Sequence, residues 1–274
     1  MIFYSLSFLW KAFHNKDSTA MLLLMIERGM PIDMVLVGDT GMEFPEMYEH
    51  WDRVEQYLLR ERGLKLTILR AAHSFEWFMF DQPKEKQSSI DLRNKLGVSL
   101  YGNGWPSMKV RWCTGQLKTH LINRTVSQLK KEYEIIHYIG IAADEAGRCK
   151  PDKHNRYPLV EWGITEAQAL QICYERGFDW GGLYEIYHRC SCWCCPLQRI
   201  GELRKLRCHH PQLWAKLLKL DERALGQFGR TPLGRFKDGW TVAALEERFA
   251  AEDRALCLFH DQQPSKKCRS RRKR

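Results

Sequence analysis

The chain has 274 residues, of which 44% are hydrophobic and 28% are charged. This composition is typical of a soluble globular protein and excludes a disordered chain. The apolar run from Ala20 to Ile26 stops at Glu27, short of the ~20 apolar residues that a membrane span needs, so no membrane partner is expected. The start of the sequence shows no secretory signal pattern, which predicts a cytoplasmic protein in a reducing compartment.

The formal net charge of +10 is concentrated near one end of the sequence. Residues 266–274 hold seven positive charges, which leaves only +3 for the rest of the chain. Like charges at this density repel one another, so we expect residues 261–274 to form a disordered basic tail. Clustered Lys and Arg side chains neutralise phosphates without needing a fold, and the tail is therefore a candidate contact for a nucleic-acid acceptor.

Taken in chain order, the first elements alternate between strand and helix. Residues 2–8, 32–37 and 64–69 are predicted strands, and the segments between them are predicted helices at 18–27 and 44–62. A further strand is expected at residues 135–141. The alternation predicts an α/β fold with a Rossmann-like, doubly wound parallel sheet. Ligands bind such sheets outside the carboxyl ends of the strands, where the loops at residues 16–18 and 39–41 would share one crevice.

From Thr165 onward the pattern becomes helical. Thr165 is predicted to cap a helix over residues 166–176, and further helices are expected over residues 202–219 and 241–256. We therefore divide the chain into an α/β domain at residues 1–164, a helical region rich in cysteine at residues 165–260, and the basic tail.

Four of the ten cysteines fall within six residues: Cys190, Cys192, Cys194 and Cys195. The Cys192 and Cys195 thiolates are separated by two residues and can reach one zinc ion or one iron-sulfur cluster. The remaining ligands must come from elsewhere in the chain. A set of buried, reduced cysteines without a metal is the alternative interpretation.

Residues 16–19 read Lys-Asp-Ser-Thr at the junction of the first predicted strand and its helix. The exposed amides and the dipole of a helix N-terminus can hold a phosphate, and Lys16 and Ser18 would add direct contacts. Taken alone, the segment is more typical of an ordinary helix start that Asp17 caps.

Several short motifs accompany this segment in a fixed order along the chain: Asp39-Thr-Gly41, Glu43-Phe-Pro45, Arg111-Trp-Cys-Thr-Gly-Gln-Leu-Lys118, Asp144-Glu145 with Arg148, Tyr157-Pro-Leu159 with Trp162, Leu183-Tyr184, and the cysteine cluster that ends at Pro196. In this order they resemble the phosphoadenosine phosphosulfate reductase family. That family belongs to the adenine-nucleotide α-hydrolase-like superfamily, which includes ATP pyrophosphatases. The resemblance covers residues 1–215.

The resemblance implies an adenine nucleotide, either ATP or phosphoadenosine phosphosulfate, in the 1–164 domain. The nucleotide-binding residues that it implies are Ser7, Lys16, Asp17, Ser18, Thr19, Asp39, Thr40 and Gly41. It also implies catalytic roles for Lys16 and Asp17, and for Arg148, which would face an anionic group.

The resemblance further implies that Cys113 joins Cys192 and Cys195 around an iron-sulfur cluster of the 4Fe-4S type, with zinc as the alternative metal. The fourth ligand stays open between Cys194, Cys190, Cys208 and no protein ligand at all.

The sequence departs from the family pattern in two places. The family's phosphate loop has glycines before Lys-Asp-Ser, whereas Phe13-His-Asn15 precedes Lys16 here and residues 9–15 look like an insertion. Glycine lets backbone amides approach a phosphate, so the nucleotide site is altered. Near the C-terminus, residues 256–260 read Leu-Cys-Leu-Phe-His and lack the Glu and the Gly of the reductases' mobile thiol motif.

The sequence thus predicts an enzyme of sulfur chemistry, either an oxidoreductase that reduces a sulfonucleotide or a sulfurtransferase that uses ATP. The degraded C-terminal motif favours sulfur transfer. The alternative is a non-catalytic protein that binds a nucleic acid or another partner, keeps a structural metal and uses its basic tail.

Overall fold

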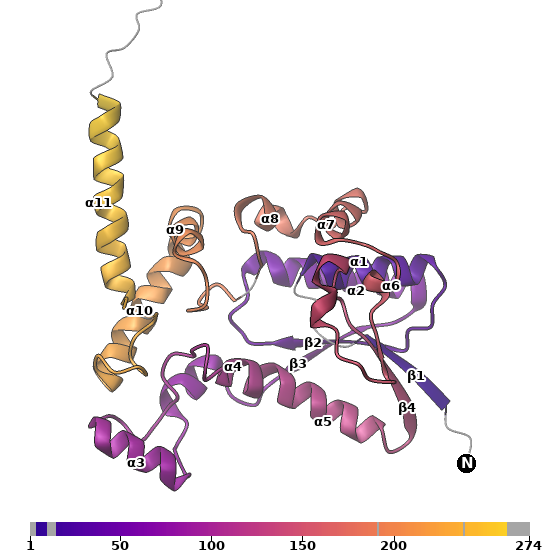
Figure 1. Ribbon diagram of the computed structural model, residues 1–274, viewed down its shortest axis with the longest axis horizontal. Coiled ribbons are helices and arrows are strands. Elements are labelled where there is room, and N and C mark those ends of the chain that lie inside the picture. The colour runs from indigo at the N-terminus through magenta and orange to yellow at the C-terminus, as the bar shows by residue number, and fades with distance from the viewer. Residues whose placement is uncertain (1–3, 10–14, 191, 238, 262–274) are drawn as a thin grey trace, which may run out of the picture.

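The computed structural model describes residues 4–9, 15–190, 192–237 and 239–261, with side chains placed from residue 15 to residue 255 within these ranges (Figure 1). Its strands form one parallel sheet in the order β3-β2-β1-β4-β5. The strands are β1 (Tyr4–Leu9), β2 (Met34–Asp39), β3 (Leu66–Arg70), β4 (Tyr133–Tyr138) and β5 (Asn155–Arg156). The predicted α/β fold with parallel strands is confirmed.

The helical segments fill the connections and the C-terminal part of the described chain. Those between the strands are α1 (Lys16–Glu27), α2 (Pro45–Arg62), η1 (Trp77–Asp81), α3 (Gln87–Leu96), α4 (Trp112–Thr114), η2 (Gly115–Thr119), α5 (His120–Leu129) and η3 (Ala143–Arg148). Those that follow β5 are α6 (Pro158–Glu161), α7 (Glu166–Glu175), η4 (Trp180–Gly182), α8 (Leu183–Ile186), α9 (Ile200–His209), α10 (Pro211–Phe228) and α11 (Val242–Asp261).

Strand boundaries differ from the predicted ones. The first three strands begin two residues later than the apolar runs that predicted them, and β2 continues through Gly38 to Asp39. The reason is that pairing with the neighbouring strand sets the strand ends: Asp39 is still in register with Arg70 of β3. The apolar pattern indicates which residues are buried, and a buried segment does not have to begin and end where the strand does.

Helices cover both faces of the sheet (Figure 1), with α1 and α2 on one face and α5 on the other. Successive side chains of β2 point to opposite faces of the sheet. Val35 and Val37 join the core under α1, whereas Leu36 packs with Ile122 and Val126 of α5. Helix termini therefore lie along the edge of the sheet at which the strands have their carboxyl ends.

Helix α1 is buried along its length from Lys16 to Ile26. Its neighbours explain this, because the sheet covers one side and α7 packs against another. Helix α7 begins at the predicted cap, and Thr165 and Gln168 form a capping box there. The capping prediction is therefore confirmed.

The single helix predicted over residues 202–219 is wrong. The chain forms two helices, α9 and α10, which meet at His210 and Pro211. Proline lacks the backbone N–H that would continue α9 and its ring clashes with the preceding turn, so it begins a new helix instead.

One apolar core cluster runs from α1 to α11 and includes Leu22, Leu217 and Phe249. The division of the chain at residues 164 and 165 stays a prediction. Residues 262–274, which hold almost all of the predicted tail, lie outside the described residues. None of the described helices is long and apolar enough to cross a membrane.

Candidate functional site

The N-terminus of α1 lies at the carboxyl edge of the sheet, beside the segment that follows β4. Gly140 of that segment approaches it so closely that a Cβ atom on Gly140 would lie 2.8 Å from the Cα atom of Ser18. Asn15 has an extended backbone with φ −137°, and its side-chain oxygen accepts a hydrogen bond from the Ser18 amide at 3.1 Å. The residue that stands where the family has glycine therefore acts as the N-cap of α1.

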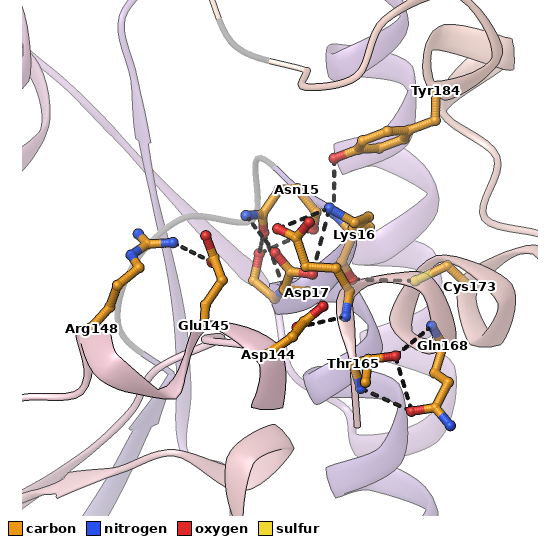
Figure 2. A network of polar contacts seen from close by, with 12 residues as sticks. Asn15, Lys16, Asp17, Asp144, Glu145, Arg148, Thr165, Gln168, Cys173 and Tyr184 are labelled. Atoms are coloured by element: carbon orange, nitrogen blue, oxygen red, sulfur yellow. Dashed lines mark hydrogen bonds and ion pairs between the residues drawn. The ribbon is translucent and has the colours of Figure 1, made fainter. Parts of the chain in front are cut away.

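Lys16 is enclosed by groups from the C-terminal part of the chain (Figure 2). Its amide donates to the Tyr184 hydroxyl at 3.0 Å, and its carbonyl accepts from the Cys173 thiol at 3.4 Å. Its ammonium lies 3.3 Å from a carboxylate oxygen of Glu166 and 3.8 Å from one of Asp17. The predicted phosphate-binding lysine is thus held among carboxylates.

Three acidic side chains converge here. Asp17, Glu145 and Glu166 each present an oxygen, and these oxygens all lie within 4.8 Å of one another. Burial is the main cause that raises the pKa of Asp17 to about 6, and the charges of Glu166 and Glu145 add to the rise while Lys16 opposes it. Arg148 forms an ion pair with Glu145 (Figure 2). The structure therefore brings all three predicted catalytic residues to one place.

The other predicted residues of the α1 loop face different surroundings. The Ser18 hydroxyl donates to the Asn15 side chain at 2.8 Å. The Thr19 hydroxyl lies 3.1 Å from His50 Nε2 inside the core, so its side chain does not face the carboxylates. The backbone of Ser7 lies in β1 opposite Ile136, and its side chain is outside the described part of the chain.

The loop after β2 is tied together by Asp39. One of its carboxylate oxygens accepts from the Gly41 amide at 2.7 Å and from the Tyr48 hydroxyl at 3.1 Å, and the other accepts from Arg70 at 2.9 Å. Gly41 has φ +74°, a left-handed conformation that favours glycine. The loop is thus held in one conformation by a buried carboxylate.

Thr40 connects this loop with the cysteines. Its hydroxyl donates to Glu43 at 3.0 Å and lies 3.4 Å from the Cys192 sulfur. The same Glu43 oxygen accepts from the Lys118 ammonium at 3.0 Å and lies 3.5 Å from Cys192. Burial is the largest single influence on the pKa of Lys118 and would lower it, but the charge and hydrogen bond of Glu43 together with the charges of Cys192 and Cys113 outweigh burial, and the pKa is raised. Gly38 permits this arrangement, because a Cβ atom there would lie 3.1 Å from the Lys118 Cα.

The cysteines of the predicted metal centre share one neighbourhood. All four are free thiols: Cys113, Cys192, Cys194 and Cys195. Burial raises the pKa of each thiol, and at Cys194 the charges of the other three add to the rise. The Trp193 amide donates to the Met42 carbonyl at 3.1 Å, which fixes the cysteine loop beside Thr40.

The two more distant candidates for the fourth ligand lie elsewhere. Cys190 is next to the Tyr184 hydroxyl, and burial raises its pKa to about 12 although the hydrogen bond from Tyr184 opposes the rise. Cys208 is exposed on α9. Of the protein ligands that the sequence left open, Cys194 is the one that the structure brings to Cys113 and Cys192.

The spacing of the thiols bears on the kind of metal. A tetrahedral zinc site holds its sulfurs ~3.8 Å apart, as follows from Zn–S bonds of ~2.3 Å. Within the described residues, the carboxylates Asp17, Glu145 and Glu166 are the one group of three or more such ligands with all atoms within 4.8 Å. No three of the thiols among the described residues therefore have all their sulfurs that close together.

Comparison with known proteins identifies the α/β part of the chain. Residues 9–137 match the family model of the phosphoadenosine phosphosulfate reductase domain. Residues 9–137 are thus a domain of this family. An uncharacterized protein of Methanocaldococcus jannaschii is 25% identical over 222 residues, which cover 74% of this chain and 38% of that protein. The chain thus spans less than half the length of this relative. No solved structure matches the chain.

Four residues that contact the candidate site were not among the site residues that the sequence predicted: Glu43, Lys118, Glu166 and Tyr184. Each lies inside or beside a motif that the sequence does show. The sequence could have indicated them only as charged or phenolic side chains close to Gly41, Cys113, Thr165 or Leu183. Nothing in one sequence indicates that these side chains meet.

Proposed function

We propose that this protein is an ATP-dependent sulfurtransferase of the phosphoadenosine phosphosulfate reductase family. The observation that carries the proposal is the contact of Thr40 with Cys192, at 3.4 Å between the hydroxyl oxygen and the sulfur. This contact supports a single site in which the Asp39–Gly41 loop, expected to line the nucleotide site, adjoins the cysteines of the expected thiol centre. A nucleotide-activated acceptor and a sulfur-carrying centre have to be neighbours in such a reaction.

The reaction that we propose has two steps. An oxygen atom of the acceptor attacks the α-phosphorus of ATP, which forms the adenylated acceptor and releases pyrophosphate. A sulfur nucleophile at the oxidation level of sulfide then attacks the acceptor carbon that bears the adenylated oxygen. A C–S bond forms, the C–O bond breaks and AMP leaves. Sulfide supplies this sulfur.

The residues of the α1 loop have defined tasks in this proposal. The α1 N-terminus and Lys16 bind the phosphates, because oriented amides and an ammonium stabilise the charge that develops when pyrophosphate leaves. The Asp39–Gly41 loop lines the nucleotide site. Arg148 lies at the outer side of the same site through its ion pair with Glu145.

The thiol centre is the second half of the proposed site. Cys113, Cys192, Cys194 and Cys195 would hold an iron-sulfur cluster, which when bound supplies a place where inorganic sulfur is held and delivered. Lys118 places a positive charge beside Cys192, and Glu43 keeps that ammonium in position at 3.0 Å. Free thiols of this kind suit a reducing compartment such as the cytoplasm.

Sulfonucleotide reduction is the less favoured reaction of this family. It would need a mobile C-terminal thiol, for which residues 256–260 are the nearest candidate. Their backbone belongs to α11, which extends away from the sheet (Figure 1). Their side chains lie outside the described part of the chain.

Product analysis decides between the two reactions. Anaerobically purified protein incubated with ATP, a sulfide donor and candidate acceptors such as tRNA should release pyrophosphate and AMP, and Lys16→Ala should abolish both. Sulfite formed from phosphoadenosine phosphosulfate, without pyrophosphate from ATP, would reverse the assignment in favour of reduction.

One observation favours the non-catalytic alternative. Two amides at the α1 N-terminus already have partners, since Lys16 donates to Tyr184 and Ser18 donates to Asn15. A phosphate would have to displace these partners. If ATP produces no thermal shift in the wild-type protein while oligonucleotides bind in a salt-sensitive manner, the binding function replaces the enzymatic one.

A further inference from the structure

Three separate elements bring carboxylates to one point at the α1 N-terminus. Asp17 comes from the first turn of α1, Glu145 from η3 and Glu166 from the first residue of α7, and their oxygens lie within 4.8 Å of one another. The position of Glu166 is fixed by Asp144, whose carboxylate accepts from the Glu166 amide at 3.0 Å. The convergence is therefore a product of tertiary structure and is not a local run of acidic residues.

Asp17 is a buried acid with one carboxylate oxygen to which the described residues donate no hydrogen bond. The residue is only 2% exposed, and its Oδ1 has no hydrogen-bond partner among the described residues. The other oxygen accepts from the Asn15 side chain at 3.1 Å. A buried carboxylate oxygen without a partner is rare because its desolvation is not compensated, so Oδ1 points to a ligand.

The Lys16 ammonium lies 3.8 Å from Asp17 Oδ1 and 3.3 Å from a carboxylate oxygen of Glu166. One ammonium faces three carboxylates. The guanidinium of Arg148 pairs with Glu145 from the solvent side, where 58% of its side chain is exposed. The site has an excess of negative charge that one further positive charge would balance.

The ligand set selects the kind of ion. Carboxylate oxygens are hard ligands that prefer Mg²⁺, Mn²⁺ and Ca²⁺ to softer metals. In an Mg²⁺ octahedron with bonds of ~2.1 Å, neighbouring oxygens are ~3.0 Å apart and opposite ones ~4.2 Å apart. The three oxygens lie within 4.8 Å of one another, so rotation of the Glu145 and Glu166 side chains toward Asp17 would bring them to that geometry.

We propose that Asp17, Glu145 and Glu166 form a binding site for a divalent, oxygen-preferring cation such as Mg²⁺, and that the Lys16 ammonium competes with this ion. The bound ion repels the ammonium and moves it away from Glu166. The released Lys16 is then available to the phosphates of a nucleotide. This last step rests on the proposed function, whereas the ion site itself does not.

Direct ion binding tests the site without any nucleotide. Mn²⁺ serves as the probe for the full chain, with free Mn²⁺ followed by electron paramagnetic resonance and Mg²⁺ added as a competitor. We expect one Mn²⁺ site per chain that Mg²⁺ displaces. Glu166→Gln and Glu145→Gln should each weaken Mn²⁺ binding by about tenfold or more, because each removes a charged ligand.

Two further variants separate this proposal from a general charge effect. Glu175→Gln makes the same change at an exposed position of the same helix, α7, and should leave Mn²⁺ binding unchanged. Lys16→Gln should tighten Mn²⁺ binding severalfold, because it removes the competing ammonium. A residue that served only to bind nucleotide would not change Mn²⁺ affinity in the absence of nucleotide.

The outcomes separate the ion site from the enzymatic function. Mn²⁺ affinity that is equal in wild type and Glu166→Gln, or that is lowered by Lys16→Gln, overturns the proposal, as does Mn²⁺ binding that requires ATP. Since Glu145 and Glu166 are half-buried, melting temperatures equal to that of the wild type show that both variants fold. Intact Mn²⁺ binding without pyrophosphate release would reject the sulfurtransferase and leave the ion site standing.

Discussion

Asp221 of α10 is a single buried acid that links three segments of the chain. One oxygen accepts from the Trp105 indole at 3.1 Å and the other from the Val242 amide at 2.6 Å. Burial is the main cause that raises the pKa of Asp221 to about 6, although both hydrogen bonds oppose the rise. Between the unfolded pKa of ~3.9 and the folded value, the folded protein binds the additional proton, so stability falls as the pH rises.

Asp221→Asn should remove this pH dependence. From about pH 4 to about pH 6, the free energy of unfolding of the wild type should fall by on the order of 2 kcal/mol relative to the variant. Urea denaturation at several pH values measures the difference in the free energy of unfolding between the two proteins. The titration of Asp17 cancels in this difference because both proteins contain Asp17. The exposed Asp52→Asn on α2 is the control. Parallel curves for wild type and Asp221→Asn would contradict the prediction.

The individual cysteines are expected to differ in whether they hold a metal centre. If Cys113, Cys192, Cys194 and Cys195 hold an iron-sulfur cluster, Cys194→Ser and Cys192→Ser should lower the iron and sulfide content of the anaerobically purified protein. The visible absorbance of the protein should fall as well. Cys208→Ser should not, because Cys208 is exposed on α9. Stoichiometric zinc in the wild type would instead mean that the thiols close around a single ion.

At the scale of elements, the contact of the β4–η3 connection with the start of α1 positions the candidate nucleotide site. Gly140 has no side chain where Ser18 lies, and a Cβ atom would be 2.8 Å from the Ser18 Cα and 2.9 Å from its nitrogen. Backbone atoms on both sides leave no flexible side chain to move. Any larger residue at position 140 must push the two elements apart.

Gly140→Ala should therefore displace the α1 N-terminus. We expect a loss of about 1–3 kcal/mol in the free energy of unfolding, together with a loss of the ATP-dependent thermal shift. Gly147→Ala in η3 is the matched control, since nothing lies within 4 Å of its Cβ position. An unchanged thermal shift in Gly140→Ala would show that the contact does not position the site.

At the scale of the whole molecule, the α/β part and the C-terminal helices share one core. The apolar cluster that begins in α1 includes Cys173 of α7, Trp180 of η4 and Phe249 of α11. Figure 1 shows α7 and α8 lying over α1, on the side away from the sheet. The almost entirely apolar segment 20–26 of α1 is buried by this second layer.

Residues 1–164 alone should therefore fail to fold cooperatively, because removing α7 exposes the apolar side of α1. The full chain should unfold in a single calorimetric transition. Well-dispersed amide resonances from the 1–164 fragment, with a sharp unfolding transition, would instead establish the predicted boundary between two independent domains.

Much of the fold could be predicted because its signals are local. Apolar runs of strand length, capping residues such as Thr165 and the polar loop at Asp39 act within about ten residues of themselves. The two helices on either side of Pro211 could have been separated on the same grounds. The family resemblance likewise depended on short motifs whose order survives in the sequence, and residues 9–137 match the family.

The sequence by itself determined the α/β alternation, the presence of a helix after the first strand and the density of thiols near residue 192. Only the tertiary structure brought Cys113 to Cys194, Glu166 to Asp17 and Tyr184 to the Lys16 amide. The physical reason is that backbone hydrogen bonding and apolar periodicity act between near neighbours in the chain. Contacts between distant side chains are decided by how the sheet, α1 and α7 pack together.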